Sequence, residues 1–212
     1  MLYYFGVGLC RTFFRLMGGL DVIGRENVPA TGGVILCPNH VSHVDPPAVG
    51  AGMRRQVHFM AKDELFRVPV LGFLIAGFGS FPVRRGTADR KAIKRAIELL
   101  EEGRVICLFP EGTRSPDGRL QEPELGASLI ALRTGAPVVP VAVIGTTEVL
   151  PAGASRPRRH RCKVVYGEPL RFDDLSGSTN RAAMKEAGRR IMSAIADLQS
   201  SHAAPCVPPP TQ

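Results

Sequence analysis

The chain contains no tryptophan, and aromatic residues make up only 6% of its 212 residues. Zinc-ligand spacings, recognition-helix signatures and basic segments interleaved with aromatics are missing, so nucleic acid is not the expected partner. The charge is nevertheless one-sided, because 27 Lys and Arg outnumber 19 Asp and Glu and give a net charge of +8. A basic protein without nucleic-acid motifs is expected to meet an anionic membrane or a phosphorylated substrate.

Cysteine is scarce and irregularly placed. The five cysteines are odd in number and widely spaced, which argues against a disulfide framework and against a metal site. Most of them lie inside apolar runs, and this placement predicts reduced, buried thiols in a cytosolic setting. They are Cys10, Cys37, Cys107, Cys162 and Cys206.

The apolar N-terminus is a poor candidate for a membrane span, which needs ~20 predominantly apolar residues. Arg11 and Arg15 interrupt it, and it lacks the charge order and the small-residue cleavage site of a signal peptide. Both arginines fall on one helix face, so residues 1–19 are expected to form an amphipathic interfacial helix with the arginines at lipid headgroups. The alternative is a terminal helix packed on the core of its own domain.

Hydrophobic residues make up 44% of the sequence, enough for one globular domain, which we assign to residues 20–201. The proline-rich end, residues 202–212, is expected to be disordered. Strand patterns alternate with helical patterns, which predicts an α/β fold with a mostly parallel mixed sheet flanked by helices. Pro140 lies inside one strand pattern and indicates an edge strand or a bulge. Strands are expected at 20–24, 34–37, 56–61, 81–83, 104–109, 137–144 and 162–167, and helices at 45–53, 87–102, 122–133 and 181–200, with two short helices around a break at Pro69.

The segment that follows the strand pattern at 34–37 holds two residues suited to base catalysis. His40 is placed where the strand ends, and Asp45 follows five residues later at the start of a helix. The carboxylate would hold one ring N–H, fix the tautomer and leave the other ring nitrogen to accept a proton from a hydroxyl. The alternative is that Asp45 caps its helix, and His43 offers a second imidazole nearby.

Two further strand patterns also end in polar turns, at residues 84–85 and 111–114. Because the carboxyl ends of parallel strands meet at one sheet edge, these turns are expected to share a cleft with the histidine. Arg85 and Arg114, together with Lys62, would then bind a phosphate, because guanidinium groups contact phosphate bidentately. A base beside a phosphate site indicates transfer to a hydroxyl of a phosphorylated molecule.

These motifs resemble, in order and spacing, those of the glycerolipid acyltransferases, the lysophosphatidic acid acyltransferase family. The resemblance covers about Pro38 to Val143, and four motifs in order make a specific signal. Pro82 and Arg84 depart from the family pattern, and both bear on the acceptor headgroup. The matching segments are Asn39-His40-x4-Asp45, Gly79-x-x-Pro82-Val83-x-Arg85, Phe109-Pro110-Glu111-Gly112-Thr113-Arg114-Ser115, Val139-Pro140-Val141 and Lys62-x-x-Leu65-x3-Pro69-x2-Gly72.

The resemblance implies an enzyme that moves a fatty acyl group from a thioester to a glycerophospholipid hydroxyl. By the same resemblance His40 and Asp45 form the catalytic base, and further positions bind the phosphorylated acceptor. It implies no metal and no cofactor, only a donor substrate, which is acyl-CoA or acyl-carrier protein. The positions carried over for acceptor binding are Lys62, Arg85, Glu111, Gly112, Thr113 and Arg114.

The expected reaction converts 1-acylglycerol-3-phosphate to phosphatidic acid in phospholipid biosynthesis, at the cytoplasmic face of the cell membrane with peripheral or monotopic attachment. Direct attack on the thioester is expected, because the chain has no Gly-x-Ser-x-Gly elbow and no cysteine in a nucleophile setting. Ser42 is the rival nucleophile within the first motif. The alternatives are acylation of another lysolipid, hydrolysis by the same histidine, a non-catalytic basic membrane-binding module, and a nucleic-acid binder suggested by charge alone.

Overall fold

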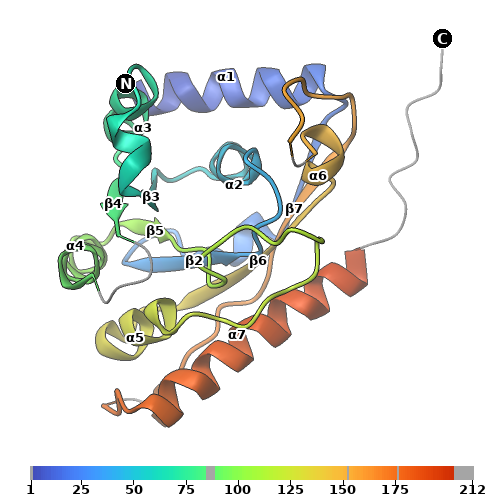
Figure 1. The fold of residues 1–212 in the computed structure, drawn as a ribbon. Coiled ribbons are helices and arrows are strands. Elements are labelled where there is room, and N and C mark those ends of the chain that lie inside the picture. The colour runs from blue at the N-terminus through green and yellow to red at the C-terminus, as the bar shows by residue number, and fades with distance from the viewer. Residues whose placement is uncertain (1, 85–88, 152, 176, 203–212) are drawn as a thin grey trace.

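The structure is a computed structural model that describes residues 2–84, 89–151, 153–175 and 177–202. Within these residues seven strands form one sheet in the order β1-β7-β6-β2-β5-β3-β4 (Figure 1). Neighbouring strands are parallel except for β6 and β7, so the predicted mostly parallel mixed sheet is confirmed. The strands are β1 (Leu20–Ile23), β2 (Val34–Pro38), β3 (Val57–Lys62), β4 (Phe81–Val83), β5 (Val105–Cys107), β6 (Val138–Ile144) and β7 (Cys162–Tyr166).

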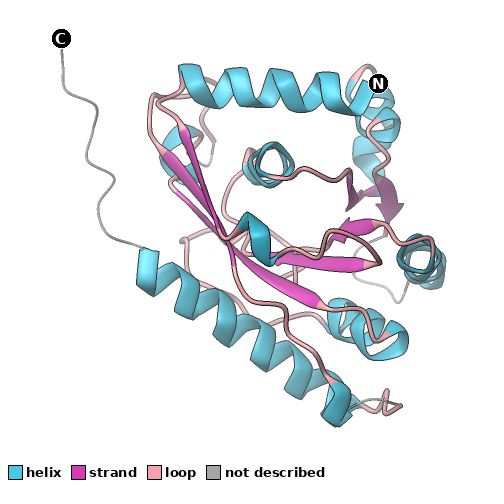
Figure 2. Cartoon of the chain, turned by 180° about the vertical axis from the view of Figure 1, so that it is seen from behind, coloured by secondary structure: helices cyan, strands magenta, loops and turns pink. Residues whose placement is uncertain are grey.

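Helices cover both faces of the sheet, as the alternating sequence pattern predicts. The helices α1 and α2 lie over one face, whereas α4, α5 and α7 lie over the other (Figure 1 and Figure 2). The α-helices are α1 (Leu2–Leu16), α2 (Asp45–Gly52), α3 (Leu71–Gly77), α4 (Arg90–Glu101), α5 (Leu125–Thr134), α6 (Thr146–Val149) and α7 (Arg181–His202), and the 3-10 helices are η1 (Arg25–Asn27), η2 (Asp63–Arg67) and η3 (Asp173–Leu175).

The central strand β2 sends side chains into both cores. Val34 and Leu36 pack with α1 and α2, while Ile35 and Cys37 pack with α4, α5 and α7. All four residues are completely buried, as expected for a parallel strand that is covered on both faces. The strand ends at Pro38, and this burial therefore fixes the point from which the candidate base leaves the sheet.

The helix α4 begins later than the sequence pattern predicts. It starts at Arg90, where Asp89 caps it by accepting hydrogen bonds from the backbone N–H groups of Lys91 and Ala92. The predicted cap, Thr87, lies outside the described residues. The capping role therefore belongs to an aspartate that the sequence pattern placed inside the helix.

The ends of α5 and α7 also differ from the prediction. α5 begins at Leu125 and not at Glu122. Pro123 disfavours helical geometry in Glu122, the residue before it, and Glu124 has an extended backbone. α7 continues to His202, one residue into the predicted tail. The rest of that tail, residues 203–212, lies outside the described residues, so its disorder stays a prediction.

Pro140 lies in β6, an interior strand between β2 and β7, so the expected edge position is wrong. Its carbonyl accepts a hydrogen bond from Gly167 N–H, and Val138 N–H donates to the Leu170 carbonyl. The three residues from Val138 to Pro140 therefore lie opposite the four residues from Gly167 to Leu170. The additional residue on the second segment forms a β-bulge. Proline has no backbone N–H to donate, and at this bulge the regular ladder of hydrogen bonds is already interrupted.

One face of α1 packs on its own domain. Arg11 lies at the end of α2, donating from Nε to the Ala51 carbonyl at 2.9 Å and from Nη2 to the Met53 carbonyl at 3.1 Å. Its placement at lipid headgroups is therefore wrong, because a guanidinium at a helix C-terminus satisfies free carbonyls and complements the helix dipole. The buried residues of α1 are Tyr3, Gly6, Val7 and Phe14.

Large apolar side chains lie exposed on the other face of α1, and the interfacial role of this helix stays a prediction. In the described part of the chain, no helix combines the length and the apolar character needed to cross a bilayer. The large exposed side chains of α1 are Leu2, Tyr4, Phe5, Leu9 and Leu16.

Candidate active site

The carboxyl ends of β2, β5, β3 and β4 lie side by side at one edge of the sheet, because these strands are parallel neighbours. The polar turns that follow them share this edge, as predicted. His40 follows β2, Glu111 follows β5, Lys62 ends β3 and Arg84 follows β4, whereas Arg85 lies outside the described residues.

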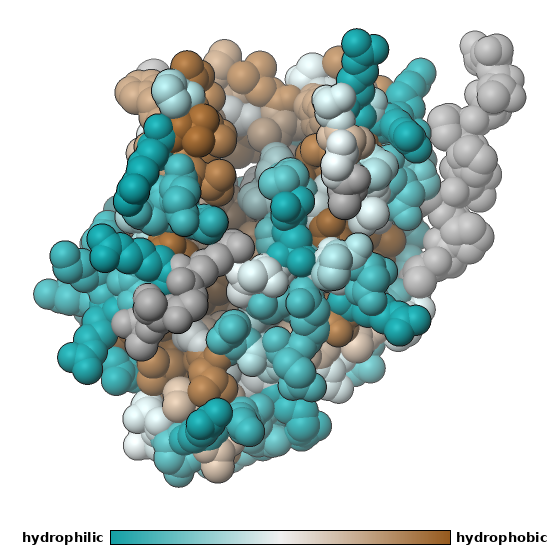
Figure 3. Space-filling model, viewed as in Figure 1, coloured by the Kyte–Doolittle hydropathy of each residue, from teal (hydrophilic) through white to brown (hydrophobic). Residues whose placement is uncertain are grey.

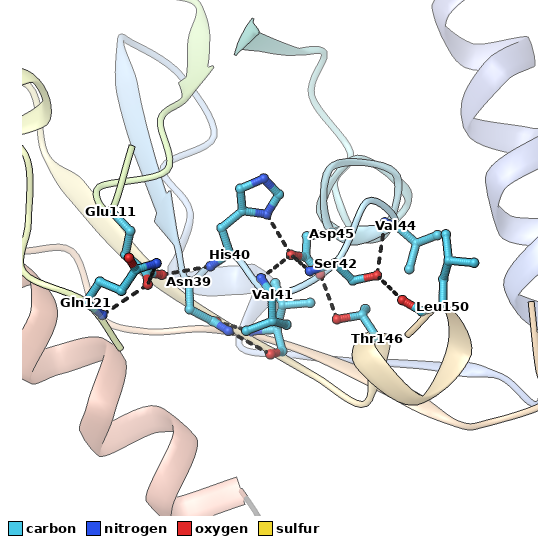
Figure 4. A network of polar contacts seen from close by, with 11 residues as sticks. Asn39, His40, Val41, Ser42, Val44, Asp45, Glu111, Gln121, Thr146 and Leu150 are labelled. Atoms are coloured by element: carbon cyan, nitrogen blue, oxygen red, sulfur yellow. Dashed lines mark hydrogen bonds and ion pairs between the residues drawn. The ribbon is translucent and has the colours of Figure 1, made fainter. Parts of the chain in front are cut away.

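His40 and Asp45 form a hydrogen-bonded pair at this edge (Figure 4). The His40 Nδ1 atom lies 2.8 Å from Asp45 Oδ2, and Asp45 is completely buried. An ionised carboxylate only accepts hydrogen bonds, so Nδ1 carries the hydrogen in the neutral ring and Nε2 is left unprotonated. The ring also stacks on Phe109, with centroids 4.0 Å apart. The pair therefore presents one oriented ring nitrogen that can accept a proton.

The Asp45 carboxylate is held by donors on both oxygens. Its Oδ2 atom accepts the backbone N–H groups of Val41 and Ser42, both at 2.7 Å, and its Oδ1 atom accepts the Thr146 hydroxyl at 2.6 Å. These donors lie outside α2, whose N-cap residue is Val44, so the helix-capping interpretation is wrong. Because a buried charge must be hydrogen-bonded, the donors stabilise the carboxylate and fix its position.

Asn39 fixes the same turn from the side of β6. Its Oδ1 atom accepts the Val143 N–H at 2.7 Å, and its Nδ2 donates to the Val143 carbonyl at 3.1 Å. The buried amide thus replaces the hydrogen-bonded rung that a further residue of β2 would make. The chain can leave the sheet at His40 without orphaned backbone groups.

Glu111 is engaged with the backbone of the catalytic turn. Its Oε1 atom accepts the His40 N–H at 2.9 Å, and its Oε2 atom accepts the Gln121 N–H at 3.1 Å (Figure 4). Burial raises the pKa of the Glu111 carboxyl, and these hydrogen bonds oppose the rise. Both oxygens are used within the chain, so the side chain positions His40, and its contact with the acceptor stays a prediction.

The turn after β5 requires glycine at its second residue. Gly112 has a left-handed backbone with φ +69°, and a Cβ atom there would lie 2.9 Å from Glu124 Cγ. Thr113 and Arg114 follow on the exposed rim. Burial, and after it the Arg114 guanidinium, lower the pKa of His43. Arg114 therefore acts electrostatically on His43, in the same turn as His40.

A cavity of about 460 Å³ lies between α1, α2, β3 and α3 and reaches the catalytic pair. Its volume falls in the range of ~300–1,000 Å³ that is usual for small-molecule sites. Most of the lining is apolar, and the ionisable side chains at it include His40, His43 and Lys62, which pairs with Glu64 at 3.2 Å. The apolar lining includes Val7, Phe59, Leu65, Leu71, Ile75 and Phe78.

Three residues near the His40–Asp45 pair show which parts of the site the sequence predicted and which it did not. The buried Ser42 hydroxyl donates to the Leu150 carbonyl at 3.0 Å, a bond that does not suit a nucleophile. Thr146 and Phe109 contact the pair but were not predicted as site residues. Each stands just beyond a strand end, after β6 and after β5, and this position is the signal that could have indicated them.

Fold and site together define an α/β protein in which a histidine, held by a buried aspartate at one end of an apolar cavity, is arranged as a general base would be. Among the site residues proposed from sequence, the structure brings His40, Asp45 and Glu111 into direct contact. Lys62 lines the same cavity, and Arg114 is near enough to influence His43.

Comparison with known proteins identifies the family to which this α/β protein belongs. The Acyltransferase family matches residues 19–144. The chain is 35% identical over 191 residues to the 1-acyl-sn-glycerol-3-phosphate acyltransferase of Bacillus subtilis (strain 168), with 88% of this chain and 92% of that protein covered. It is 33% identical over 154 residues to the chloroplastic 1-acyl-sn-glycerol-3-phosphate acyltransferase BAT2 of Brassica napus, covering 71% of this chain and 44% of that protein.

A solved structure agrees with the sequence comparisons. The 1-acyl-sn-glycerophosphate (LPA) acyltransferase PlsC from Thermotoga maritima superposes with a TM-score of 0.76 at 26% identity, with 95% of this chain and 81% of that chain covered. The chain therefore belongs to the Acyltransferase family, and it is an acyltransferase.

Proposed function

We propose that the protein transfers a fatty acyl group from acyl-CoA or acyl-carrier protein to the free hydroxyl of 1-acylglycerol-3-phosphate, giving phosphatidic acid for phospholipid biosynthesis. The observation that carries the proposal is the His40–Asp45 pair, which leaves one ring nitrogen free at an apolar cavity. The similar proteins of Bacillus subtilis and Thermotoga maritima are named for this acceptor, and their similarity supports the same acceptor here.

In the proposed reaction, His40 Nε2 takes the proton from the acceptor hydroxyl while the hydroxyl oxygen attacks the thioester carbonyl. The new C–O bond forms, the C–S bond breaks, and the imidazolium returns its proton to the departing thiolate. Asp45 stabilises the imidazolium through the hydrogen bond at Nδ1. General base catalysis of this kind accelerates reactions by ~10²–10⁴-fold, and positioning of the two substrates supplies the rest.

The proposed placement of the substrates follows the chemistry of the lining. An acyl chain suits the apolar cavity, because each buried CH₂ contributes about 0.8 kcal/mol of transfer free energy. The acceptor phosphate suits the positive rim of the sheet edge, where Arg114 and Lys62 are exposed. Arg85, Gly112 and Thr113 remain proposed acceptor-binding positions on the strength of the resemblance.

We further propose that the enzyme works at the cytoplasmic face of the cell membrane as a peripheral or monotopic protein. The exposed apolar face of α1 supports this placement. A second exposed apolar segment, from Val68 to Phe73, leads into α3, which lies at one end of α1 (Figure 1). The four cysteines among the described residues are free thiols, which suits a reducing compartment.

The test is direct. Purified protein is incubated with 1-acylglycerol-3-phosphate and either acyl-CoA or acyl-carrier protein, and phosphatidic acid is measured by mass spectrometry. We expect product with at least one donor and none with the His40→Ala variant. Parallel reactions with other lysolipids test the acceptor, and a higher rate with one of them would replace 1-acylglycerol-3-phosphate in the proposal. No acylated lipid in any reaction would contradict it.

A further inference from the structure

A basic loop lies against the C-terminal end of α1 and is not used by the proposed chemistry. Residues 156–159 carry three arginines in the connection between β6 and β7, and all three are exposed. The loop is fixed to the body of the protein, because His160 N–H donates to the Met17 carbonyl at 2.6 Å and Arg158 N–H donates to the Val149 carbonyl at 2.8 Å. Its charges are therefore held in one place beside α1.

These charges are not neutralised within the described part of the chain. Arg156, Arg158 and Arg159 form no ion pair there, and neither does Arg15 in the last turn of α1. Some arginines elsewhere are paired with carboxylates, as Arg95 is on α4 and as Arg189 and Arg190 are on α7, so what distinguishes the loop is that its three exposed arginines lie together beside Arg15. The loop also borders an open hollow of about 410 Å³, lined by Thr147, Glu148, Pro151, Arg158, Arg159 and His160.

The basic loop shares one side of the molecule with the exposed apolar residues. Both ribbon views place α1, the α3 segment and the loop carrying α6 along the same side, with α3 at one end of α1 and the loop at the other (Figure 1 and Figure 2). On that side, hydrophobic residues gather over α3 and the start of α1, and hydrophilic residues gather at the far end (Figure 3). Phe5 and Phe73 are 66% and 74% exposed, so the apolar part reaches solvent.

A surface that is apolar at one end and basic at the other matches a bilayer that offers acyl chains and negatively charged headgroups together. We propose that Arg15, Arg156, Arg158 and Arg159 form an anionic-phospholipid contact that orients the enzyme on the membrane. This contact rests on the proposed membrane attachment and specifies the kind of lipid that the enzyme meets there.

Vesicle co-sedimentation without substrates tests the contact independently of turnover. The intact chain is mixed with vesicles of phosphatidylcholine alone and with vesicles that also contain phosphatidylglycerol. The test variant is Arg156→Gln/Arg158→Gln/Arg159→Gln. The matched control removes the same charge from α5 and α7 on the opposite face, as Arg133→Gln/Arg181→Gln/Lys185→Gln. Thermal melting shows that each variant is folded.

The expected result is preferential binding of the intact chain to the anionic vesicles, weakened by the test variant by tenfold or more, since one arginine near an anionic surface contributes about fivefold. The control variant should keep the preference. Equal loss in both variants would show that net charge alone is responsible and would overturn the proposal, as would equal binding to both kinds of vesicle. Stronger binding of the loop to duplex DNA than to anionic vesicles would also overturn it.

Acyl transfer is also measured with a short-chain acceptor that stays dissolved as single molecules. This measurement tests the proposed function separately from the lipid contact. The test variant should keep that activity, because the three arginines lie outside the catalytic turn. If the intact chain is inactive in solution but prefers anionic vesicles, the proposed function fails and the lipid contact stands.

Discussion

The Thr146 hydroxyl donates to the Oδ1 atom of Asp45 at 2.6 Å, on the oxygen that His40 does not contact. Both residues are completely buried. The Asp45 carboxylate is therefore held from two sides, by the His40 imidazole on one oxygen and by the Thr146 hydroxyl on the other. We therefore predict that Thr146 is a positioning residue, which acts on the reaction through Asp45.

Thr146→Val should lower kcat by ~10-fold while the KM for the acceptor changes little, because the carboxylate loses a charge-assisted hydrogen bond and its fixed orientation. Thr146→Ser keeps the hydroxyl and should restore most of the rate. The comparison is made by steady-state kinetics across pH. A purely structural role would instead lower the melting temperature without changing the pH profile, and an unchanged kcat in Thr146→Val would remove the residue from the catalytic unit.

His40→Ala should lower turnover by ~10²–10⁴-fold, because the proposed base that Asp45 orients is removed, while acceptor binding stays near normal. His43→Ala provides the matched control, since His43 lines the same cavity but makes no contact with Asp45 like that of His40. Product formation by mass spectrometry and acceptor binding by calorimetry separate the two effects. Comparable losses in both variants would contradict the assignment of the base to His40.

Burial and the Arg114 guanidinium hold the pKa of His43 below its ordinary value of 6.5. The folded protein therefore resists protonation of this ring more than the unfolded chain does. The stability that His43 contributes is fully present above its ordinary pKa and is lost as the pH falls through the lowered folded value. Arg114→Gln should raise the pKa of His43 part of the way back, since burial remains.

This prediction is checked by following the His43 ring resonances through an NMR titration. Arg119→Gln is the control, because Arg119 is an exposed arginine that pairs with Asp117 at 3.9 Å. An equal shift in both variants, or none with Arg114→Gln, would show that Arg114 does not act on the catalytic turn.

Ile75→Phe should shift the donor preference toward shorter acyl chains, because Ile75 lines the cavity and a larger side chain removes space from it. Ala76→Phe adds a ring at an exposed position of the same helix, which is not part of the lining, and should leave the preference unchanged. Rates with a series of acyl-CoA lengths measure both variants. Identical length profiles would place the acyl chain elsewhere.

The sheet and the catalytic pair were accessible from sequence because they rest on short-range patterns. The apolar run before Pro38 predicts a buried strand, and the spacing of His40 and Asp45 fits a turn that closes on itself. The carboxyl-end rule for parallel strands then brings the turn at Glu111 to the same edge. These features need no knowledge of side-chain packing, and they appear as expected in the fold.

The remaining features depend on contacts between distant segments. The cavity exists because α1 and α3 pack on the same side of β3, which no local pattern encodes. Arg11 looked like a headgroup ligand, yet it ends on the carbonyls of Ala51 and Met53. Glu111 was assigned to acceptor binding by resemblance, which stays a prediction, and the structure adds that its carboxylate holds the His40 backbone. In each case a polar side chain found its partner within the fold, which composition and spacing do not reveal.

The amide of Asn39 reaches 104 residues along the chain to Val143, and the Asp45–Thr146 bond spans 101. Contacts of such long separation require a large loop to close before they contribute any stability. A growing chain that ends before Val143 carries the histidine and the aspartate but lacks these supports. The geometry of the His40–Asp45 pair therefore depends on segments from both halves of the chain.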